Sequence, residues 1–245
     1  LNAPAAILMT SGSTGTPKPV LLSYSQLLFS AMGSALRLGH HPDDSWLCCL
    51  PLNHVGGLSI ITRCSWYGTT IMLQSGFDAR AVSDALDSGK VSLVSLVPTM
   101  LERILEHRSN APFPATVRAI LLGGAATGQP LLDRCKRLQL PVAVTWGMTE
   151  TASQIATTEP GVYETQGCVG APLQFAEVSV YNNALRVSGP IAGQPFITQD
   201  LGRIDEAGRI WIEGRRDDVI NSGGELIDPS EVEAVLTAHP KVVDA

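Results

Sequence analysis

The run of small polar residues at positions 10–18 carries the residue types that a polyphosphate-binding loop needs. It reads Thr10, Ser11, Gly12, Ser13, Thr14, Gly15, Thr16, Pro17 and Lys18. Glycines let backbone N–H groups approach an anion, hydroxyls add hydrogen-bond donors, and the lysine supplies a compact positive charge. The composition of this run therefore predicts a phosphate-binding loop.

This loop differs from a Walker A motif. Pro17 stands where that motif has its second glycine, and Pro19 stands where it has Ser or Thr. A flexible Gly/Ser linker is the structural alternative, because composition alone would allow it. A linker explains neither the apolar residues 5–9 before the loop, which we expect to form a buried strand, nor the Pro-Lys-Pro exit.

Length, composition and charge narrow the function class. A chain of 245 residues with 44% hydrophobic content can fill a large core. A formal net charge of −6 without a basic patch argues against binding to nucleic acid or to an anionic membrane. Five cysteines without a C-x-x-C pair fit reduced thiols in the cytoplasm. Because the sequence has no signal-peptide pattern and no 18-residue apolar run, we expect no membrane insertion.

Apolar segments alternate with helical patterns over the first part of the chain. We expect strands at residues 20–22, 46–50, 69–73, 91–97, 117–122 and 142–144. We expect helices from the Ser23/Gln26 capping box to Leu38, then at residues 58–67, 78–89, 99–107 and 129–138. Near-continuous apolar strands are typical of a parallel sheet buried on both faces, with ligands at the carboxyl ends of the strands. The fold class is therefore α/β, a largely parallel sheet covered by helices.

The pattern changes after Ser153. Between residues 169 and 212 the segments are short and alternate in polarity, which predicts a small antiparallel β subdomain. Residues 214–218 are predicted to form a charged linker between two parts of the chain, and a helix is expected over residues 228–239.

Four separated stretches follow the order of motifs in one enzyme superfamily. They lie at residues 10–18, 51–57, 146–150 and 200–220. Together they resemble the adenylate-forming superfamily of acyl-CoA synthetases, luciferases and adenylation domains. Within it, the stretches most similar to the o-succinylbenzoate–CoA ligases of menaquinone biosynthesis are residues 95–101, 122–126 and 147–155.

The resemblance implies a two-step ligase that uses ATP, Mg²⁺ and coenzyme A. A carboxylate attacks the α-phosphorus of ATP and displaces pyrophosphate, and the thiol of coenzyme A then attacks the acyl-adenylate and releases AMP. An anion must approach a polyanion, so the site must neutralise phosphate charge and align the reactants. The implied partners are a small-molecule carboxylic acid and coenzyme A, and homo-oligomer formation stays open.

The resemblance also implies a division of the chain. Residues 1–168 would form the nucleotide- and acyl-binding portion of the large domain, and residues 169–213 a small β subdomain. Residues 214–245 would form a hinge and the beginning of a carboxyl-terminal lid domain. The expected fold is thus part of the adenylate-forming enzyme fold.

The resemblance places the polyphosphate and the metal ion on the first and third stretches. Thr10 would contact phosphate or the metal shell, and Thr149 would bind the α-phosphate, with Lys18 and Thr149 assisting catalysis. Glu150 would be the Mg²⁺ ligand, because a carboxylate oxygen suits a metal that also bridges phosphates. The residues expected to hold the β- and γ-phosphates are Ser11, Gly12, Ser13, Thr14, Gly15 and Lys18.

The resemblance places the adenosine on later stretches. Trp146, where the family usually has tyrosine, would lie against the adenine ring. Asp200 would accept hydrogen bonds from the ribose, although the family's Thr-Gly-Asp reads Thr-Gln-Asp here, in a segment that looks shortened. Arg215 would reach the ribose and phosphates, and Asp217 would form the hinge of the lid. The nucleotide-lining backbone would come from Gly123, Gly124, Ala125, Gly147 and Met148.

Each of these residues also has an ordinary structural interpretation. Trp146 could be a core tryptophan, Glu150 a helix-start carboxylate, and Gly123 with Gly124 a strand-to-helix turn. The charged residues at 215–217 could form a solvated surface, which is the commoner case. The agreement of four ordered motifs favours the functional interpretation.

The acyl group would bind near His54 and Gly147, beside the family's gate motif. A lone histidine is more often structural, and Asn53 stands where the family usually has an aromatic residue. The match to the gate motif nevertheless implies that His54 orients the acyl carboxylate. Arg63 is a charge on an otherwise apolar helix. We expect it to pair with a second carboxylate on the substrate, as in o-succinylbenzoate, and a snorkelling surface arginine is the alternative.

The family completes adenylation with a lysine of the lid. The lysines of this chain, none in a fitting context, are Lys18, Lys90, Lys136 and Lys241. We therefore expect a piece of a longer ligase or a truncated relative with impaired chemistry. The remaining alternatives are another acyl- or aryl-CoA ligase, an adenylation domain feeding a carrier protein, and an impaired fragment that only binds nucleotide or a partner.

The missing lysine gives the first testable prediction. These 245 residues alone should adenylate poorly, because no lid lysine stabilises the charge that develops in the transition state. The measurement is acid-dependent exchange of labelled pyrophosphate into ATP. Exchange at the rate of a complete family member would contradict the expectation.

Overall fold

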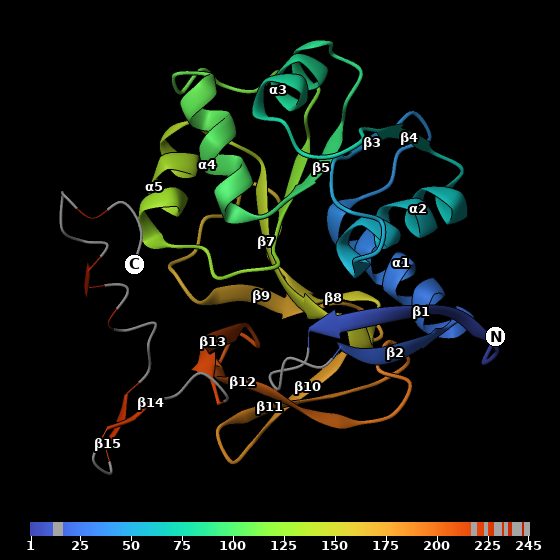
Figure 1. Cartoon of the computed structure of the whole chain (residues 1–245), viewed down its shortest axis with the longest axis vertical. Helices are drawn as coiled ribbons and strands as arrows, with labels where there is room; N and C mark the ends of the chain where they lie inside the picture. Colours follow the sequence, from blue (N-terminus) through green and yellow to red (C-terminus); the bar gives the residue numbers. More distant parts are fainter. Residues whose placement is uncertain are drawn as a thin grey trace.

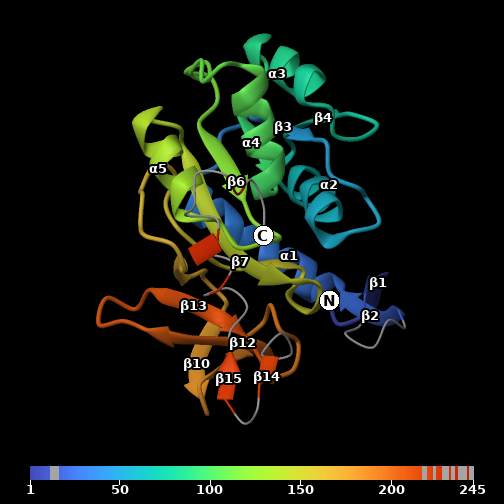
Figure 2. The same cartoon turned by 60° about the vertical axis from the view of Figure 1, so that its left-hand side comes forward.

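A mixed sheet of eleven strands runs through the described part of the chain and joins two halves of different construction (Figure 1). The computed structural model describes residues 1–11, 17–216, 220–222 and 225–227, and single positions 232, 235, 236 and 242. The strand order is β10-β11-β12-β13-β9-β8-β7-β6-β5-β3-β4. The antiparallel strands β10 to β13 lie at one end of the molecule, and helices α3 and α4 lie at the other (Figures 1 and 2).

The first half is parallel, as the apolar segments predict. Its strands are β3 (Ser45–Cys48), β4 (Thr70–Leu73), β5 (Leu93–Leu96), β6 (Ala119–Leu122) and β7 (Val142–Met148). They pair in parallel in the order β4-β3-β5-β6-β7, and every residue of β3, β5 and β6 is buried. The prediction of a parallel sheet is confirmed. Strand β7, however, continues to Met148 and does not end at Val144, because its last residues pair with the next strand.

Helices cover both faces of this parallel half. They are α1 (Tyr24–Leu38), α2 (Val55–Tyr67), α3 (Ala79–Asp87), α4 (Pro98–His107) and α5 (Gln129–Arg137). One core cluster joins α3, α4 and α5 to the sheet, and a second joins α1 and α2 to it. Alternate residues of the same strands enter the two clusters, as Leu47 and Cys48 of β3 do.

Local sequence signals set the ends of these helices. The side chains of Ser23 and Gln26 form the predicted capping box of α1, and Gly39 follows its last residue. Asp78 caps α3 by accepting a hydrogen bond from the backbone N–H of Ala81 at 2.8 Å. Helix α2 begins at Val55, three residues before the expected start, because His54 takes the N-cap position.

The second half is antiparallel. Its strands are β8 (Ser153–Thr157), β9 (Cys168–Pro172), β10 (Glu177–Tyr181), β11 (Ala184–Ser188), β12 (Phe196–Ile204) and β13 (Ile210–Arg215). A short 3₁₀ turn, η1 (Thr149–Thr151), joins β7 to β8. The expected antiparallel strands are present. They begin at Ser153, before the expected residue 169, and they continue the parallel sheet through the β7–β8 pair.

The residues around the predicted phosphate loop form a separate two-stranded antiparallel ribbon. Strand β1 (Pro4–Ser11) pairs with β2 (Pro17–Ser23), so the loop lies between two strands as expected. The expectation of a fully buried first strand is wrong. Leu8 is 7% exposed, but Ile7 and Met9 are 65% and 52% exposed, because alternate residues of a ribbon face opposite sides. A second ribbon, β14 (Ile220–Ser222) with β15 (Glu225–Ile227), follows β13, and the expected helix over 228–239 falls largely outside the described residues.

A charged pair ties the amino ends of the parallel strands together. Arg118 donates from Nε to Asp44 Oδ1 at 2.8 Å and also reaches the carbonyls of Leu38 and Gly39. The Asp44 carboxylate accepts further hydrogen bonds from the backbone N–H of His41 and the hydroxyl of Ser92. Burial alone would raise the pKa of Asp44, but these hydrogen bonds outweigh it and lower the pKa to about 2.

This shift predicts an acid-sensitive contribution to stability. A carboxyl group whose pKa falls from 3.8 to about 2 on folding stabilises the fold above its unfolded pKa, and the contribution is lost as the pH falls toward 2. Asp44→Asn should lower the free energy of unfolding by about 2 kcal/mol at pH 7 and by much less near pH 2. Urea unfolding at several pH values measures both. The control is Asp43→Asn, which changes an exposed neighbour and should leave stability unchanged at each pH.

Candidate active site

The loop after β6 packs closely against the neighbouring strands. A side chain at Gly123 would meet Thr145 Cγ2 at 2.5 Å, and Gly124 has a positive φ of +83° with Val97 beside it. Close packing therefore explains both glycines structurally. Gly124 and Ala125 are nevertheless exposed, next to the strand that carries Trp146, where a ligand can reach their backbone.

The turn after β7 carries Thr149 and Glu150, and both side chains are half-buried. Gly147 allows this turn to close, because a Cβ there would lie 1.8 Å from the carbonyl oxygen of Ser153. The fully buried Thr151 hydroxyl bonds to the carbonyls of Met148 and Ser153, both at 3.1 Å. The turn therefore presents the Thr149 and Glu150 side chains from a tightly folded backbone.

The ribbon that carries the predicted phosphate loop packs against this turn. Strand β2 contacts η1, and Val20 and Leu22 share a core cluster with Ala152. Thr10 lies opposite Lys18, and its hydroxyl donates to the Lys18 carbonyl at 3.1 Å. The strand carrying Lys18 and the turn carrying Glu150 thus lie side by side, as binding of one polyphosphate with its metal ion requires. The predicted residues Gly12, Ser13, Thr14 and Gly15 lie outside the described residues, as does the predicted hinge residue Asp217.

Three residues predicted to hold the adenosine meet between β7, β12 and β13. The indole Nε1 of Trp146 donates to Asp200 Oδ2 at 2.9 Å, and Arg215 Nη1 lies 3.8 Å from Asp200 Oδ1. Asp200 and Arg215 are cross-strand partners, and the Thr198 hydroxyl accepts a hydrogen bond from the backbone N–H of Asp200 at 3.1 Å. Trp146 is only 8% exposed and packs in the antiparallel core. Most of its side chain is therefore accounted for by the alternative interpretation as a core tryptophan.

Of the three residues predicted to contact the acyl group, Gly147 lies on β7, whereas His54 and Arg63 lie at the start and in the body of helix α2. His54 is its exposed N-cap residue and makes no side-chain capping bond. Arg63 is 1% exposed, so the alternative of a snorkelling surface arginine is wrong. Its Cζ lies 5.5 Å from the centre of the Trp46 ring, and its Nε, Nη1 and Nη2 have no hydrogen-bond partner among the described residues. Burial lowers the pKa of Arg63 to about 10, which still leaves it charged at neutral pH.

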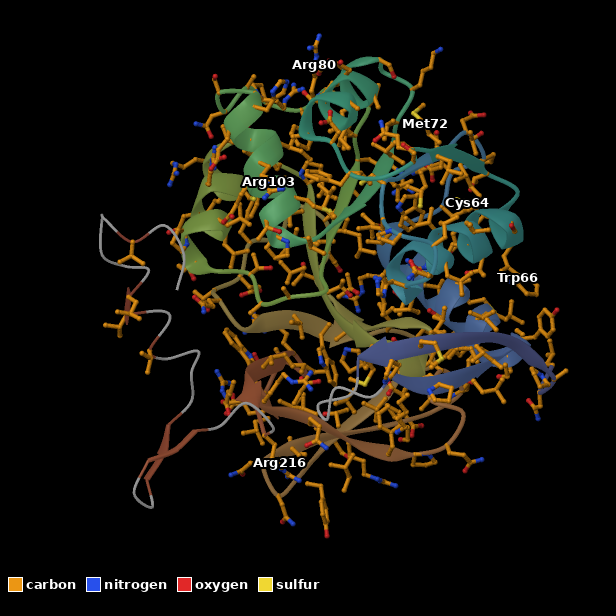
Figure 3. All side chains as sticks on the ribbon, in the orientation of Figure 1. Cys64, Trp66, Met72, Arg80, Arg103 and Arg216 are labelled. Carbon is orange, nitrogen blue, oxygen red and sulfur yellow. The ribbon has the colours of Figure 1, made fainter. Side chains whose placement is uncertain are left out.

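Arg63 lies against the Trp46 ring, and Tyr67 and Cys64 are close enough to act on its charge. Its neighbour Cys64 faces the sheet and is 1% exposed, whereas Trp66, two residues on, lies at the outer surface of the helix (Figure 3). A buried cation without a counter-ion is costly, and the cation–π contact with Trp46 offsets only about 1–2 kcal/mol of that cost. Within the described residues this cost is not offset by a hydrogen bond or an ion pair.

Sequence reasoning missed two residues of the site, Gln26 and Ser30. Gln26 was recognised only as half of a capping box, yet its amide also donates to the Glu150 carbonyl at 2.9 Å. The Ser30 hydroxyl donates to the Ala152 carbonyl at 2.8 Å. These contacts join residues more than 120 positions apart, so no local pattern could have revealed them.

Comparison with known proteins decides the family. The sequence profile described as "AMP-binding enzyme" matches residues 1–216. The chain belongs to this family. It is 42% identical to the 2-succinylbenzoate–CoA ligase of Geobacillus kaustophilus (strain HTA426) over 272 aligned positions, which cover 100% of this chain and 56% of the relative.

Solved structures agree with this assignment. The o-succinylbenzoate CoA synthetase (MenE) of Bacillus subtilis in complex with the acyl-adenylate intermediate OSB-AMP matches with a TM-score of 0.92 and 36% identity, covering 100% of this chain and 56% of that one. The same enzyme in complex with ATP and magnesium ion matches with a TM-score of 0.91 and 36% identity, over 99% of this chain and 56% of that one. The chain thus spans about half the length of these relatives. No helix in the described residues is long and apolar enough to cross a membrane.

The Trp146–Asp200 bond allows a test of the expectation that these two residues contribute to nucleotide binding. Trp146→Phe keeps an aromatic ring but removes the indole N–H, so AMP affinity should fall about tenfold, the loss expected for one hydrogen bond to a charged group. Isothermal titration calorimetry measures the AMP affinity of the wild type and of the variant. The matched control is Trp211→Phe, which removes the 3.0 Å bond to Asp205 in the same half of the sheet. Equal AMP affinities for the wild type and Trp146→Phe would contradict the assignment.

Proposed function

We propose that this chain is the nucleotide- and acyl-binding part of an ATP-dependent acid–thiol ligase that acts on o-succinylbenzoate in menaquinone biosynthesis. In this reaction the acid is adenylated with release of pyrophosphate, and the acyl group passes to coenzyme A. The observation that carries the substrate assignment is Arg63, a buried guanidinium with no hydrogen-bond partner among the described residues, on the helix that follows the gate motif. Relatives 36–42% identical bear the name 2-succinylbenzoate–CoA ligase, which agrees with this proposal.

The polyphosphate end of ATP would bind where β2 meets the η1 turn. Lys18 would contribute positive charge at the exit of the glycine-hydroxyl loop, with Thr10 and Ser11 at its entrance. The Thr149 hydroxyl would donate a hydrogen bond to the α-phosphate. This neutralisation matters because the attacking carboxylate carries the same sign of charge as the phosphates.

Glu150 fits the role of a Mg²⁺ ligand. Its carboxylate is half-buried beside the strand that carries Lys18, and the described residues contain no group of three or more His, Cys, Asp or Glu side chains that could hold a metal. A single carboxylate is what Mg²⁺ commonly takes from a protein when substrate phosphates complete its shell. The ion would neutralise charge that develops on the phosphates.

The adenosine would bind over the carboxyl ends of β6 and β7. Asp200 would accept hydrogen bonds from the ribose, and Arg215, its cross-strand partner, would reach toward the phosphates. Gly123, Gly124, Ala125, Gly147 and Met148 would supply backbone beside the nucleotide. Trp146 would contribute its ring edge to the adenine site, because only 8% of the residue is accessible.

The acyl group would lie along helix α2. His54 would orient the reacting carboxylate at the exposed start of the helix, and Arg63 would bind the second carboxylate. At the helical rise of about 1.5 Å per residue, the nine positions between them correspond to about 13 Å along the helix axis. A monocarboxylic substrate would leave Arg63 unpaired, which argues against a general acyl- or aryl-CoA ligase.

We further propose that the chain is divided into a nucleotide- and acyl-binding portion (1–168), a small β subdomain (169–213) and a hinge with the beginning of the lid (214–245). Asp217 would form the hinge, and coenzyme A would be the second substrate. The five cysteines are free and buried, which supports a cytoplasmic location. A catalytically impaired nucleotide-binding chain is the alternative function, favoured if ATP binds and no adenylate forms.

Binding of acyl-adenylate analogues tests the function without requiring turnover. The probes are OSB-AMS, the ligand bound to an arginine-to-lysine variant of E. coli MenE, and the corresponding 3-benzoylpropanoyl analogue (the benzoyl analogue below), which lacks only the second carboxylate. The wild type should prefer OSB-AMS by about 10- to 100-fold, the range expected for a buried charge-assisted pair. Arg63→Gln should abolish this preference while leaving the affinity for the benzoyl analogue within a few-fold.

The control for charge is Arg80→Gln on α3, which removes an exposed arginine at the far end of the molecule (Figure 3). It should leave both affinities unchanged. If neither analogue binds the wild type, the adenylate-forming assignment is wrong for this chain. If both bind equally well, the dicarboxylic substrate is wrong.

A further inference from the structure

Helix α1 presents two polar side chains to the turn that carries Glu150. Gln26 and Ser30 are four residues apart, so they lie on the same face of the helix, and they are 8% and 2% exposed. Gln26 Nε2 donates to the Glu150 carbonyl at 2.9 Å, and Ser30 Oγ donates to the Ala152 carbonyl at 2.8 Å. Two hydrogen bonds thus hold the backbone on both sides of Thr151.

The turn needs such support. Ala152 and Ser153 have positive φ values of 53° and 111°, a conformation that residues with a Cβ rarely adopt. Strained residues of this kind persist only where the surrounding structure fixes them. The bond from the backbone N–H of Ala152 to the Thr149 carbonyl closes the turn but does not anchor it to the rest of the protein. Besides the packing of β2 against the turn, the hydrogen bonds from Gln26 and Ser30 of α1 anchor it.

Gln26 connects the turn directly to the ribbon that carries Lys18. Its Oε1 accepts hydrogen bonds from the backbone N–H and the hydroxyl of Ser23, the last residue of β2, at 3.1 and 3.2 Å. Its Nε2 is shared between the Glu150 carbonyl and the Ile191 carbonyl, the latter at 3.3 Å. The Gln26 amide therefore accepts hydrogen bonds from the ribbon through its oxygen and donates one to the Glu150 turn through its nitrogen.

We propose that Gln26 and Ser30 are positioning residues that set the Glu150 side chain at a fixed place relative to the phosphate-binding ribbon, and so determine how tightly Mg²⁺ binds together with ATP. The inference rests on the proposed function, because it requires Glu150 to face the magnesium ion. It adds to that function a coupling between the phosphate loop and the metal ligand through helix α1. Residues that orient a metal ligand typically affect metal affinity about 10- to 100-fold when they are replaced.

The experiment compares ATP and AMP binding to the whole chain by calorimetry. ATP affinity is measured across a series of Mg²⁺ concentrations, and AMP affinity is measured without Mg²⁺. Gln26→Met keeps the length of the side chain and removes its hydrogen bonds, and Ser30→Ala removes one hydroxyl. We expect each to raise the Mg²⁺ concentration at half-saturation about tenfold, with AMP affinity within twofold of the wild type.

One control separates positioning from general stability. Ser34→Ala removes another buried hydroxyl of α1, which makes no hydrogen bond among the described residues. It should lower the melting temperature at most, without shifting the Mg²⁺ dependence. Ser30→Ala is the conservative variant that keeps the test decisive if Gln26→Met does not fold.

Several outcomes would overturn the inference. One is an unchanged Mg²⁺ dependence in Ser30→Ala and in Gln26→Met. Another is a parallel loss of AMP and ATP affinity, and a third is an equal shift in the Ser34→Ala control. Failure of the proposed function gives a different result, because the wild-type chain itself would then show no Mg²⁺-dependent binding of ATP.

Discussion

The packing of strand β2 against the η1 turn is the constraint on which the rest of the site depends. The chain carries a formal net charge of −6, so a polyphosphate can be held only by local groups arranged against the overall charge. Lys18 and Glu150 are 132 positions apart, yet their elements touch through a small core of Val20, Leu22 and Ala152. Apolar burial brings together the two elements that carry these charged residues, and hydrogen bonds from α1 hold the backbone of the turn.

The sequence predicted those parts of the fold that local patterns determine. Apolar runs located the parallel strands, and Ser23 with Gln26 located the start of α1, because each signal lies within a few consecutive residues. It could not predict that β1 and β2 form a separate ribbon, since Ile7 and Met9 are as apolar as a buried strand and only pairing decides which face is covered. Among the site residues, motifs located Trp146 and Asp200, but the bond between them depends on pairing across several strands.

Arg63, which we propose as a substrate-binding residue, departs from the rules that stabilise a fold. A well-packed apolar side chain at this position would remove the cost of an uncompensated buried charge. The sequence marked the residue as unusual because its helix is otherwise apolar, and the structure removed the surface alternative by burying it. Sequences break such rules mainly at functional sites, where a bound anion would offset the cost of the buried charge. A buried arginine with no hydrogen-bond partner among the described residues is therefore more informative about a ligand than an exposed arginine.

The continuous sheet explains how the two ends of a nucleotide can be held by different halves of the chain. The Glu150 turn is anchored to α1 on the parallel side, whereas Asp200 and Arg215 belong to antiparallel strands. Strand β7 belongs to both halves, because it pairs in parallel with β6 and antiparallel with β8. Trp146 lies on this strand and bonds to Asp200, and Glu150 follows four residues later. Extension of β7 to Met148 therefore fixes the spacing between Asp200 and Glu150, the carboxylates that we propose for binding the ribose and the metal ion, because both are positioned from this one strand.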